Sequence, residues 1–512
     1  MKRNNLLFTI VGFLLFCGCN DFLNEEPDDR AKVETPSDIK ELLVNAYPQA
    51  AYYVINEIMS DNVIDRGFGR NCITAITDDE MYRWKEGTDS DTDSPFAVWT
   101  GWYEGIAAAN YALRVIESKP DQENYKSMRG EALLCRALGH FFLVNLWAEH
   151  YDPQTASTAL GIPYVTEPET VAVKEYKRNT MEEVYNLIEA DILRGLALID
   201  DKSYAIPKFH FTKRAAHAFA ARFYTYKGTD WDKVLYHSLQ AAPDDFTTEV
   251  RDYKKLNDLG VMDYMKEYTN PSLANILLSV CTETYWNDVY QTCPPKNSRY
   301  VLTNEMQYNI YERNSANSLH KGLWNYNRIT TTDGSMTTMY KAFAYFKNAS
   351  LNSSWGNTYL NIPMFTVEDV ALNRAEAYAM LGDTLRALQT INRFIKTRTP
   401  DYNEIKHRVT MDRAIAYFSQ SKWDSERLEP HYKAELEADP NKMVLMMAVC
   451  YLRRKEFLQE GMRWFDIKRF HLQVVHKLHW EDSEIVLDRY DKRRALQIPQ
   501  EAQKAGVVPN ER

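Results

Sequence analysis

The sequence predicts a mostly α-helical protein, in which a tetratricopeptide-like helical repeat scaffold carries large irregular insertions. Three observations lead to this fold class. Residues 123–149 place apolar side chains at helical spacing, two distant segments repeat one helix–glycine–helix pattern, and the long stretches between helical segments lack that period.

The strongest helical period lies in residues 123–149. Apolar or small residues recur there at steps of four and three, which places them on one face of an α-helix. Leu134, Leu138 and Phe141 widen that face, so we expect this helix to be mostly buried. The residues at regular spacing are Met128, Ala132, Cys135, Gly139, Phe142 and Leu146.

Two segments share one pattern. Each begins with Phe-Thr, continues with a helix rich in small residues, and reaches a glycine before a second apolar helix. This order is typical of tetratricopeptide repeats, so residues 212–242 and 366–398 are predicted to form matching helical hairpins. A single hairpin cannot bury its own apolar face, which implies a stacked array interrupted by insertions.

The two main insertions span about 56–98 and 243–365. Both are poor in helical period and rich in Asn, Asp, Thr, Gly and aromatic residues. Long irregular segments on a rigid scaffold are where binding residues usually lie, so we expect the binding face there.

The N-terminus reads as an export signal. Lys2 and Arg3 precede an apolar run over 6–16, which is shorter than the about 20 residues that span a bilayer. The run ends at Gly18-Cys19, which resembles a bacterial lipobox. In a lipobox the thiol of the cysteine is acylated, and cleavage leaves that cysteine as the first residue of the mature chain. The alternative is an ordinary signal peptide that contains cysteines. The segments expected are a lipoprotein signal peptide at 1–18, a lipidated flexible tether at 19–35 and a single domain at 36–512.

Composition limits the possible partners. The formal net charge is −10, and removal of the signal would leave the chain more acidic. Because nucleic acid binding needs a basic face, this charge argues against a nucleic acid partner. Aromatic residues make up 13% of the chain, a surplus that suits stacking on sugars or peptides.

The cysteines do not form a disulfide framework, because an odd number remains after Cys17 and Cys19 and their spacing is irregular. Cys135 and Cys450 lie in apolar helical patterns and are predicted to be buried thiols. Cys281 and Cys293 either bridge a loop or stay free. The remaining cysteines are Cys72, Cys135, Cys281, Cys293 and Cys450.

The most specific pattern lies near the C-terminus, where residues 453–457 read RRKEF and residues 460–469 read EGMRWFDIKR. Alternating Arg and Glu beside Trp464 and Phe465 predicts a packed helix end held by charge-assisted hydrogen bonds rather than a catalytic group.

This pattern resembles the signature of the SusD/RagB family of outer-membrane lipoproteins. Further matches follow the family's order along nearly the whole chain, whereas the tail at 509–512 departs from the family's usual ending. The supporting matches are Gly101-Trp102-Tyr103 to Ala109-Asn110, Arg129-Gly130-Glu131-Ala132 to Arg136-Ala137, Glu376-Ala377-Tyr378 to Ile391-Asn392, and Ile498-Pro499.

The resemblance implies a surface-exposed, lipid-anchored outer-membrane protein that binds oligosaccharide and delivers it to a SusC-like TonB-dependent transporter, without a cofactor. Three rival functions stay open: a RagB-like peptide-binding lipoprotein, a surface glycosidase and a purely structural surface protein. Turnover of a labelled glycan would separate the glycosidase from a binding protein.

Motifs for catalysis or metal binding are weak. The sequence lacks Gly-x-Ser-x-Gly, His-Glu-x-x-His and Walker A patterns, so we expect no enzyme. His471, His476 and His479 cluster in a stretch expected to be helical, where a solvated or packed face is favoured over a metal site. Residues 89–93 resemble the start of a calcium loop, but Ser94 and Thr100 occupy the positions of its Gly and Glu, which favours an acidic loop.

The aromatic residues divide into two groups. Trp99, Trp102 and Trp231 lie in or beside helical patterns and are predicted to be core. Others stand among polar residues, where a flat apolar face beside hydrogen-bonding groups suits a sugar ring, although a structural role is about as frequent. The predicted ligand-binding residues are Trp286, Trp324 and Trp355, with Tyr285, Tyr326, Asn287, Asn325, Asp61 and Trp84.

Overall fold

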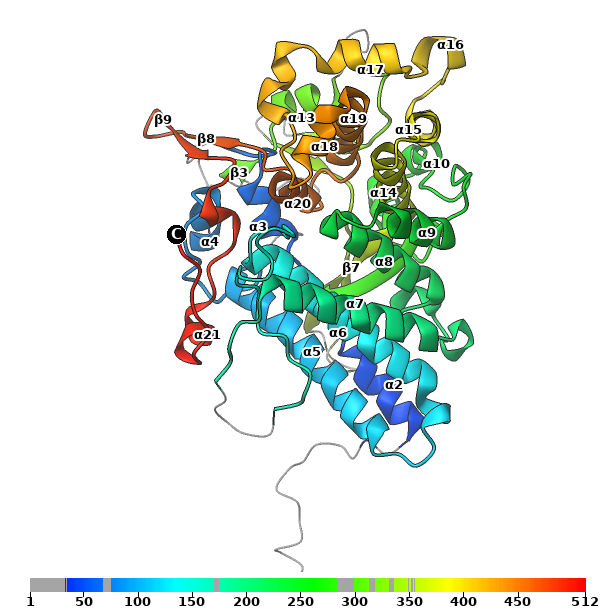
Figure 1. The fold of residues 1–512 in the computed structure, drawn as a ribbon, viewed down its shortest axis with the longest axis vertical. Coiled ribbons are helices and arrows are strands. Elements are labelled where there is room, and N and C mark those ends of the chain that lie inside the picture. Colours follow the sequence, from blue (N-terminus) through cyan, green and yellow to red (C-terminus); the bar gives the residue numbers. More distant parts are fainter. Residues whose placement is uncertain are drawn as a thin grey trace, which may run out of the picture.

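The computed structural model describes residues 33, 35–67, 75–169, 175–282, 299–312, 318–330, 336–348, 350, 353 and 355–512. Its body is a stack of helix pairs (Figure 1), so the prediction of a mostly helical fold is confirmed. The stacked helices are α5 (Pro95–Glu117), α6 (Lys126–Trp147), α7 (Met181–Leu198), α8 (Lys213–Lys227), α9 (Trp231–Ala241), α14 (Val367–Met380), α15 (Thr384–Arg398) and α19 (Pro440–Glu456).

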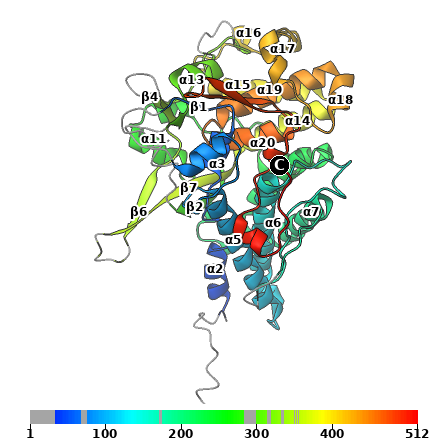
Figure 2. The same cartoon turned by 90° about the vertical axis from the view of Figure 1, so that its left-hand side faces the viewer.

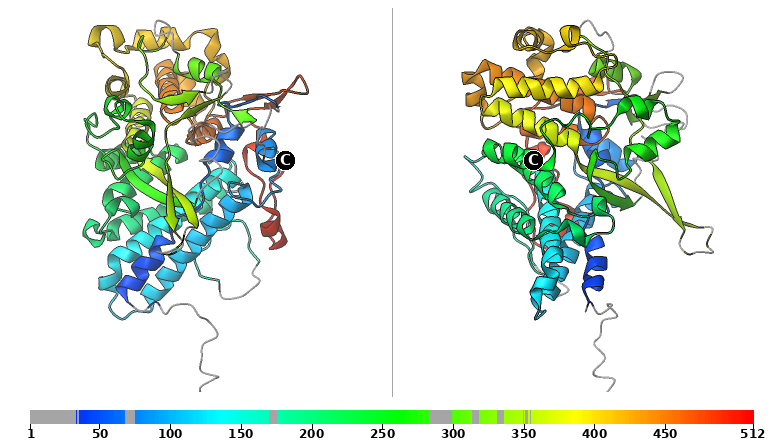
Figure 3. Two further views of the ribbon diagram at one scale, coloured as in Figure 1. Left: turned by 180° about the vertical axis from the view of Figure 1, so that it is seen from behind. Right: turned by 90° about the vertical axis from the view of Figure 1, so that its right-hand side faces the viewer.

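The two repeated segments fold as the predicted hairpins, α8 with α9 and α14 with α15. Thr212 and Thr366 cap the first helix of each pair, because each hydroxyl accepts a backbone N–H three residues on. Gly228 and Gly382 adopt φ values of 67° and 77°, a left-handed backbone that favours glycine. Moreover, α14 packs directly on α8 and α9, as the yellow and green helices of Figure 3 show, so the array continues across the insertion.

Helix α6 is buried on nearly every side, as its broad apolar face predicts. Trp99, Trp102 and Trp231 are also buried, which confirms their assignment to the core. Cys135 and Cys450 are buried free thiols as predicted, and Cys281 is a third, whereas its possible partner Cys293 lies outside the described residues.

The insertions contain more regular structure than their sequences indicate, because short helices and strands show too few periods to be recognised. Antiparallel pairing of β1 with β3 joins the first insertion to the second, and a second sheet has the order β2–β7–β6. The elements are α3 (Tyr53–Met59), β1 (Ile64–Asp65), α4 (Ile76–Tyr82), α10 (Tyr253–Asn257), α11 (Val261–Tyr268), β2 (Asn275–Thr282), β3 (Tyr300–Val301), α13 (Asn304–Tyr311), β4 (Arg328–Thr330), β5 (Thr337–Met339), β6 (Ala344–Asn348) and β7 (Gly356–Thr366).

The remaining elements flank the array. They are α2 (Pro36–Val44), α16 (Glu404–His407), α17 (Met411–Phe418), α18 (Lys433–Ala438), α20 (Met462–Arg469), β8 (Val474–Leu478), β9 (Ser483–Leu487) and α21 (Gln500–Lys504). Figure 2 shows the β6–β7 hairpin projecting from the body on one side and α21 lying in front of α5. In the part of the chain that the structure describes, no helix combines the length and apolar character needed to span a bilayer.

The C-terminal signature forms a buried ionic network, as the alternation of Arg and Glu predicts. Arg453 donates through Nε to Asp466, at 3.1 and 3.2 Å, and through another nitrogen to Asp369 at 3.2 Å. Arg469 pairs with Glu376 and Asp466, at 2.6 and 3.2 Å. The signature therefore ties α19 and α20 to the second helical hairpin.

The junction of α20 with α3 explains the glycine of the signature. Gly461 has φ 68°, and a Cβ there would lie 3.0 Å from the Cα of Tyr53, which is too close for most side chains. The Glu57 carboxylate accepts the backbone N–H groups of Gln459 and Gly461, at 3.0 and 3.3 Å, and Asn56 donates to the Gly461 carbonyl at 3.0 Å.

The prediction that His471, His476 and His479 lie in one helical stretch is wrong. Helix α20 ends at Arg469, and His476 lies on β8, where alternate side chains point inward. The buried His476 ring stacks on Tyr82 and Trp84, with centroids 4.0 and 4.4 Å apart. Among the described residues, no group of three or more His, Cys, Asp or Glu side chains is arranged to hold a metal.

Hydrogen bonds attach the last residues to the body of the protein. Asn510 donates through its side chain to the carbonyls of Trp147 and Leu496, both at 2.8 Å. Arg512 donates to the carbonyls of Trp84 and Ala495, both at 3.0 Å.

Candidate functional site

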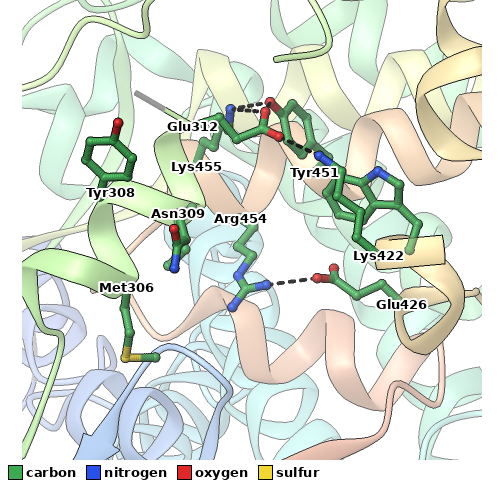
Figure 4. A pocket seen from close by; sticks show the side chains of 11 residues that line it. Met306, Tyr308, Asn309, Glu312, Lys422, Glu426, Tyr451, Arg454 and Lys455 are labelled. Atoms are coloured by element: carbon green, nitrogen blue, oxygen red, sulfur yellow. Dashed lines mark hydrogen bonds and ion pairs between the residues drawn. The ribbon is translucent and has the colours of Figure 1, made fainter. Parts of the chain in front are cut away.

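A pocket of about 510 Å³ lies where α13, the end of α19 and the turn at 421–426 meet (Figure 4). We call it the α13 pocket. Helix α13 contributes Met306, Tyr308, Asn309 and Ile310, and α19 contributes Tyr451, Arg454 and Lys455, while Glu312, Lys422, Trp423 and Glu426 complete the lining. It combines aromatic rings with many hydrogen-bonding groups, the composition expected of a site for a polar ligand that carries apolar faces.

One side of the α13 pocket is built around Glu312, which ends α13 in a left-handed conformation. Its carboxylate accepts hydrogen bonds from the hydroxyls of Tyr417 and Tyr451 and from Lys422 at 2.9 Å. Burial raises the pKa of Glu312, but the Lys455 ammonium 3.6 Å away and these donors hold that pKa below its usual value. The carboxylate is therefore ionised and fully partnered.

Lys455 is the buried cation of this cluster. Burial lowers the pKa of its ammonium to about 7, against the opposing attraction of Glu312. Its nitrogen lies 3.9 Å from the centre of the Tyr451 ring and hydrogen-bonds to the hydroxyl of that tyrosine.

The other side of the α13 pocket is an ionic chain through Asp61, a predicted ligand contact. Asp61 accepts two hydrogen bonds from Arg463, at 2.8 and 2.7 Å, and lies 3.2 Å from Arg454. Burial raises its pKa, but these two guanidinium groups hold the pKa of Asp61 well below its usual value. Both arginines also bond Glu426. Asp61 thus positions the pocket's arginine, and its contact with ligand hydroxyls stays a prediction.

A second pocket of about 380 Å³ lies beside the first, beyond the end of α13, and contains Trp324, Asn325 and Tyr326. The structure therefore brings three predicted residues together. Tyr326 stacks on Tyr311, with ring centroids 4.2 Å apart, and the Tyr311 hydroxyl donates to the Lys455 carbonyl at 2.9 Å. Tyr311 and Lys455 thus separate the two pockets.

Within this second pocket the predicted roles differ from the geometry. Trp324 is only 5% exposed and packs near Phe394 in the core, so it offers little ring face for stacking, contrary to the prediction. Asn325 donates its backbone N–H to the Arg398 carbonyl at 2.7 Å, and its side-chain oxygen accepts from Asn257 at 2.6 Å.

The remaining predicted residues lie elsewhere. Trp84 is 1% exposed and donates its indole N–H to the Met59 carbonyl at 3.0 Å, so the prediction that it contacts ligand is wrong. Trp355 is 71% exposed just before β7, and it lines neither pocket. Tyr285, Trp286 and Asn287 lie outside the described residues.

Sequence reasoning missed Tyr308 and Trp423. Tyr308 lies on an eight-residue helix within the predicted binding insertion, and it is 43% exposed. Trp423 lies among Lys, Asp and Ser like the predicted tryptophans, but it lies in a short 3-10 helix, Ser421–Glu426, outside both insertions. Its polar neighbourhood was the signal that could have identified it.

Two family models match the chain. One, described as starch-binding and associating with the outer membrane, matches residues 21–225, and the SusD family model matches residues 215–507. No curated protein sequence matches the chain.

Solved structures share the fold. A SusD superfamily protein from Bacteroides thetaiotaomicron is 18% identical with a TM-score of 0.62, and the match covers 94% of this chain and 100% of the other. One from Bacteroides fragilis is 18% identical with a TM-score of 0.64, covering 93% and 99%. A laminarin binding SusD-like protein is 16% identical with a TM-score of 0.60, again covering 93% and 99%. At such low sequence identities, the similarity to these solved structures shows a shared fold and no more.

Proposed function

Because the chain belongs to the SusD family, we propose that it is a non-enzymatic, cell-surface glycan-binding lipoprotein that delivers oligosaccharide to a SusC-like TonB-dependent transporter in the outer membrane. The description of the family model over residues 21–225, which names starch and the outer membrane, supports the ligand class and the location.

The α13 pocket is the observation that carries the proposed glycan binding. A sugar ring needs a flat apolar surface beside groups that exchange hydrogen bonds with its hydroxyls. Tyr308 and Trp423 supply rings, and Asn309, Arg454 and Glu426 supply donors and acceptors in the same pocket. We therefore propose that Tyr308 and Trp423 contact the sugar, with Tyr326 and Asn325 extending the site into the neighbouring pocket.

Charge pairing in the α13 pocket favours a glycan over a peptide. Lys422 and Lys455 face Glu312, while Arg454 faces Glu426 and Asp61. A peptide with charged termini or side chains would have to displace these internal partners, whereas an uncharged sugar can hydrogen-bond without disturbing them.

Replacement of Tyr308 or Trp423 by Ala is expected to weaken glycan binding about thirtyfold, because loss of an aromatic anchor costs on the order of 2 kcal/mol. The measurement is calorimetry with neutral oligosaccharides, starting from fragments of starch and laminarin. Tyr236→Ala, which removes an exposed ring on α9, is the matched control and should leave affinity unchanged.

Thermal unfolding of each variant separates lost binding from lost folding. Unaltered affinity in both folded site variants would contradict the proposed site. Retention of peptides instead of glycans would favour the RagB-like alternative, and release of shorter products from a labelled glycan would favour the glycosidase.

The proposed anchor has its own test. Cys19→Ala is expected to abolish fatty-acid labelling and to leave the protein either soluble or with its signal uncleaved, because Cys19 follows the only apolar run of signal-peptide type in the sequence. The measurement is metabolic labelling with palmitate followed by fractionation. Labelling that persists in the variant would contradict the anchor.

A further inference from the structure

A surface groove of about 420 Å³ follows α15 near the top of Figure 1, where the chain turns back through α16 into α17. We call it the α15 groove. All of its lining residues lie between 385 and 411, a stretch that the structure describes without a gap. None of them lines either pocket beside α13, so the groove needs its own explanation.

The side chains that α15 contributes to the groove change from apolar to basic along one face. Leu385, Leu388, Asn392 and Lys396 follow helical spacing and form one row, and Arg393 borders the row near its end. The row therefore begins with two leucines, passes a neutral amide and ends with a lysine. Its length is roughly 16 Å, because an α-helix rises about 1.5 Å per residue.

The opposite wall of the groove has the same order. Asn392 fixes the alignment of the two walls, because its side-chain oxygen accepts the backbone N–H of Val409 at 2.7 Å and its amide donates to the Val409 carbonyl at 2.8 Å. The chain arrives at Val409 from the C-terminal end of α15. Arg408 therefore lies on the lysine side of Asn392, and Met411 lies on the leucine side.

Positive charge gathers at one end of the α15 groove, in a chain whose net charge is −10. The charged residues of the lining are Arg393, Lys396, Arg408 and Glu404. Arg393 donates to the Asp244 carboxylate at 2.8 Å, and Glu404 lies 3.9 Å from Arg408. Lys396 forms no hydrogen bond or ion pair through its ammonium within the described part of the chain. This ammonium is therefore available to an anion.

Other charged groups near Lys396 do not cancel this charge. Asp245 is within electrostatic range, but its carboxylate accepts the hydroxyl and the backbone N–H of Thr247, at 2.6 and 3.2 Å. Arg413 adds a guanidinium behind the groove, because it donates to the Arg408 carbonyl at 2.6 Å. Lys396 also borders a polar hollow, whose other exposed charged residues are two of each sign: Lys254, Lys255, Asp252 and Asp401.

The middle of the α15 groove offers few free hydrogen-bonding groups. The Asn392 amide is occupied by the carbonyls of Val409 and Leu388, both at 2.8 Å, and Gln389 is the other side-chain amide of the lining. Leu385 is 64% exposed, so the leucine end is open apolar surface. A sugar or a peptide backbone would leave polar groups unpaired here, whereas an acyl chain has none to pair.

From this gradient we propose that the α15 groove binds a medium-chain carboxylate, with its acyl chain along Leu385 and Leu388 and its carboxylate at Lys396, beside Arg393 and Arg408. The proposed glycan site shares no residue with this groove, so the two proposals are independent.

The test compares octanoate with octanamide, which has the same length without the charge. Calorimetry on the full chain is expected to show octanoate binding at least about tenfold tighter, because a hydrogen bond to a charged group is stronger than a neutral one. Lengthening the probe to decanoate should strengthen binding at least about threefold, because each added methylene buries more apolar surface.

Single variants locate the two ends of the ligand. Lys396→Gln should weaken octanoate binding at least about fivefold and leave octanamide binding unchanged, because it removes the charge. Leu385→Ser should weaken both at least about threefold, and Glu404→Gln, which removes the acid of the lining, should strengthen octanoate binding about twofold. Lys406→Gln is the matched control, an exposed lysine of α16 outside the lining, and should alter octanoate affinity less than about twofold. All four residues are exposed, so the variants should fold.

Equal affinity for octanoate and octanamide, no binding of either, or insensitivity to Lys396→Gln would overturn the proposal. Dimerisation that Lys396→Glu abolishes would assign the groove to a second copy of the chain and would also overturn it. Tyr308→Ala should leave octanoate affinity unchanged, and Lys396→Gln should leave glycan affinity unchanged. Failure of this proposal is therefore distinguishable from failure of the proposed function.

Discussion

The Arg453→Met variant is expected to lose about 3–5 kcal/mol of folding free energy, because removing one partner of a buried ion pair leaves the other charges uncompensated. Arg453 is fully buried, and it bonds Asp466, Asp369 and the side-chain oxygen of Asn373, the last at 3.0 Å. Methionine fills much of the same volume but donates no hydrogen bond. Urea unfolding followed by circular dichroism gives the free energy.

Arg386→Met is the matched control for this variant. Arg386 lies on the surface of α15, where its guanidinium is 3.6 Å from the Asp383 carboxylate and 5.8 Å from the centre of the Tyr378 ring. Exposed pairs contribute about 0–1 kcal/mol, so this variant should unfold almost as the parent does. Loss of less than about 1 kcal/mol in Arg453→Met would contradict a structural role for the network.

The Lys468→Met variant is expected to lose about 3 kcal/mol, because it leaves buried carbonyl groups without donors. The Lys468 ammonium donates to the carbonyls of Asn145, Leu146 and Ala148, at 2.5, 3.5 and 2.7 Å, and so caps the end of α6. Lys477→Met on the exposed side of β8 serves as the control.

The cost of Lys468→Met should also depend on pH. Burial lowers the pKa of Lys468 to about 7 in the folded protein, whereas in the unfolded chain its pKa keeps the ordinary lysine value of 10.5. Between these values the unfolded state binds more protons, so wild-type stability rises with pH. The variant lacks this gain, and its deficit should widen by up to about 1.4 kcal/mol per pH unit. A constant deficit between pH 7 and 9 would contradict the lowered pKa.

The helical array could be predicted because its determinants are local. A capping threonine, a left-handed glycine and apolar spacing suffice to define each hairpin, and in the first hairpin Thr212 and Gly228 play the first two roles. The β8 strand was missed because its five residues alternate too briefly to outweigh the preceding helical pattern, which placed His476 on a helix.

The site was harder to predict because exposure depends on distant segments. Trp84 and Trp324 stand among polar residues in the sequence, yet His476 covers one ring and the Phe394 region covers the other. In the sequence Asp61 looks like a free carboxylate in a loop, because its partner Arg463 is 402 positions away and only the structure places the two side by side. Sequence neighbours therefore indicate which residue types gather on the insertion face, but not which rings remain open.

The junction of α3 with α20 can form only late in synthesis of the chain. Asn56 and Gly461 are separated by 405 positions, and a chain growing at roughly 5–20 residues per second needs about 20–80 s to make the second after the first. Until then the Glu57 carboxylate lacks its two backbone donors, and α3 lacks α20, one of the helices on which it packs. The segment around α3 therefore reaches its final packing only after the C-terminal signature is made, which suits a chain predicted to cross a membrane unfolded before it folds.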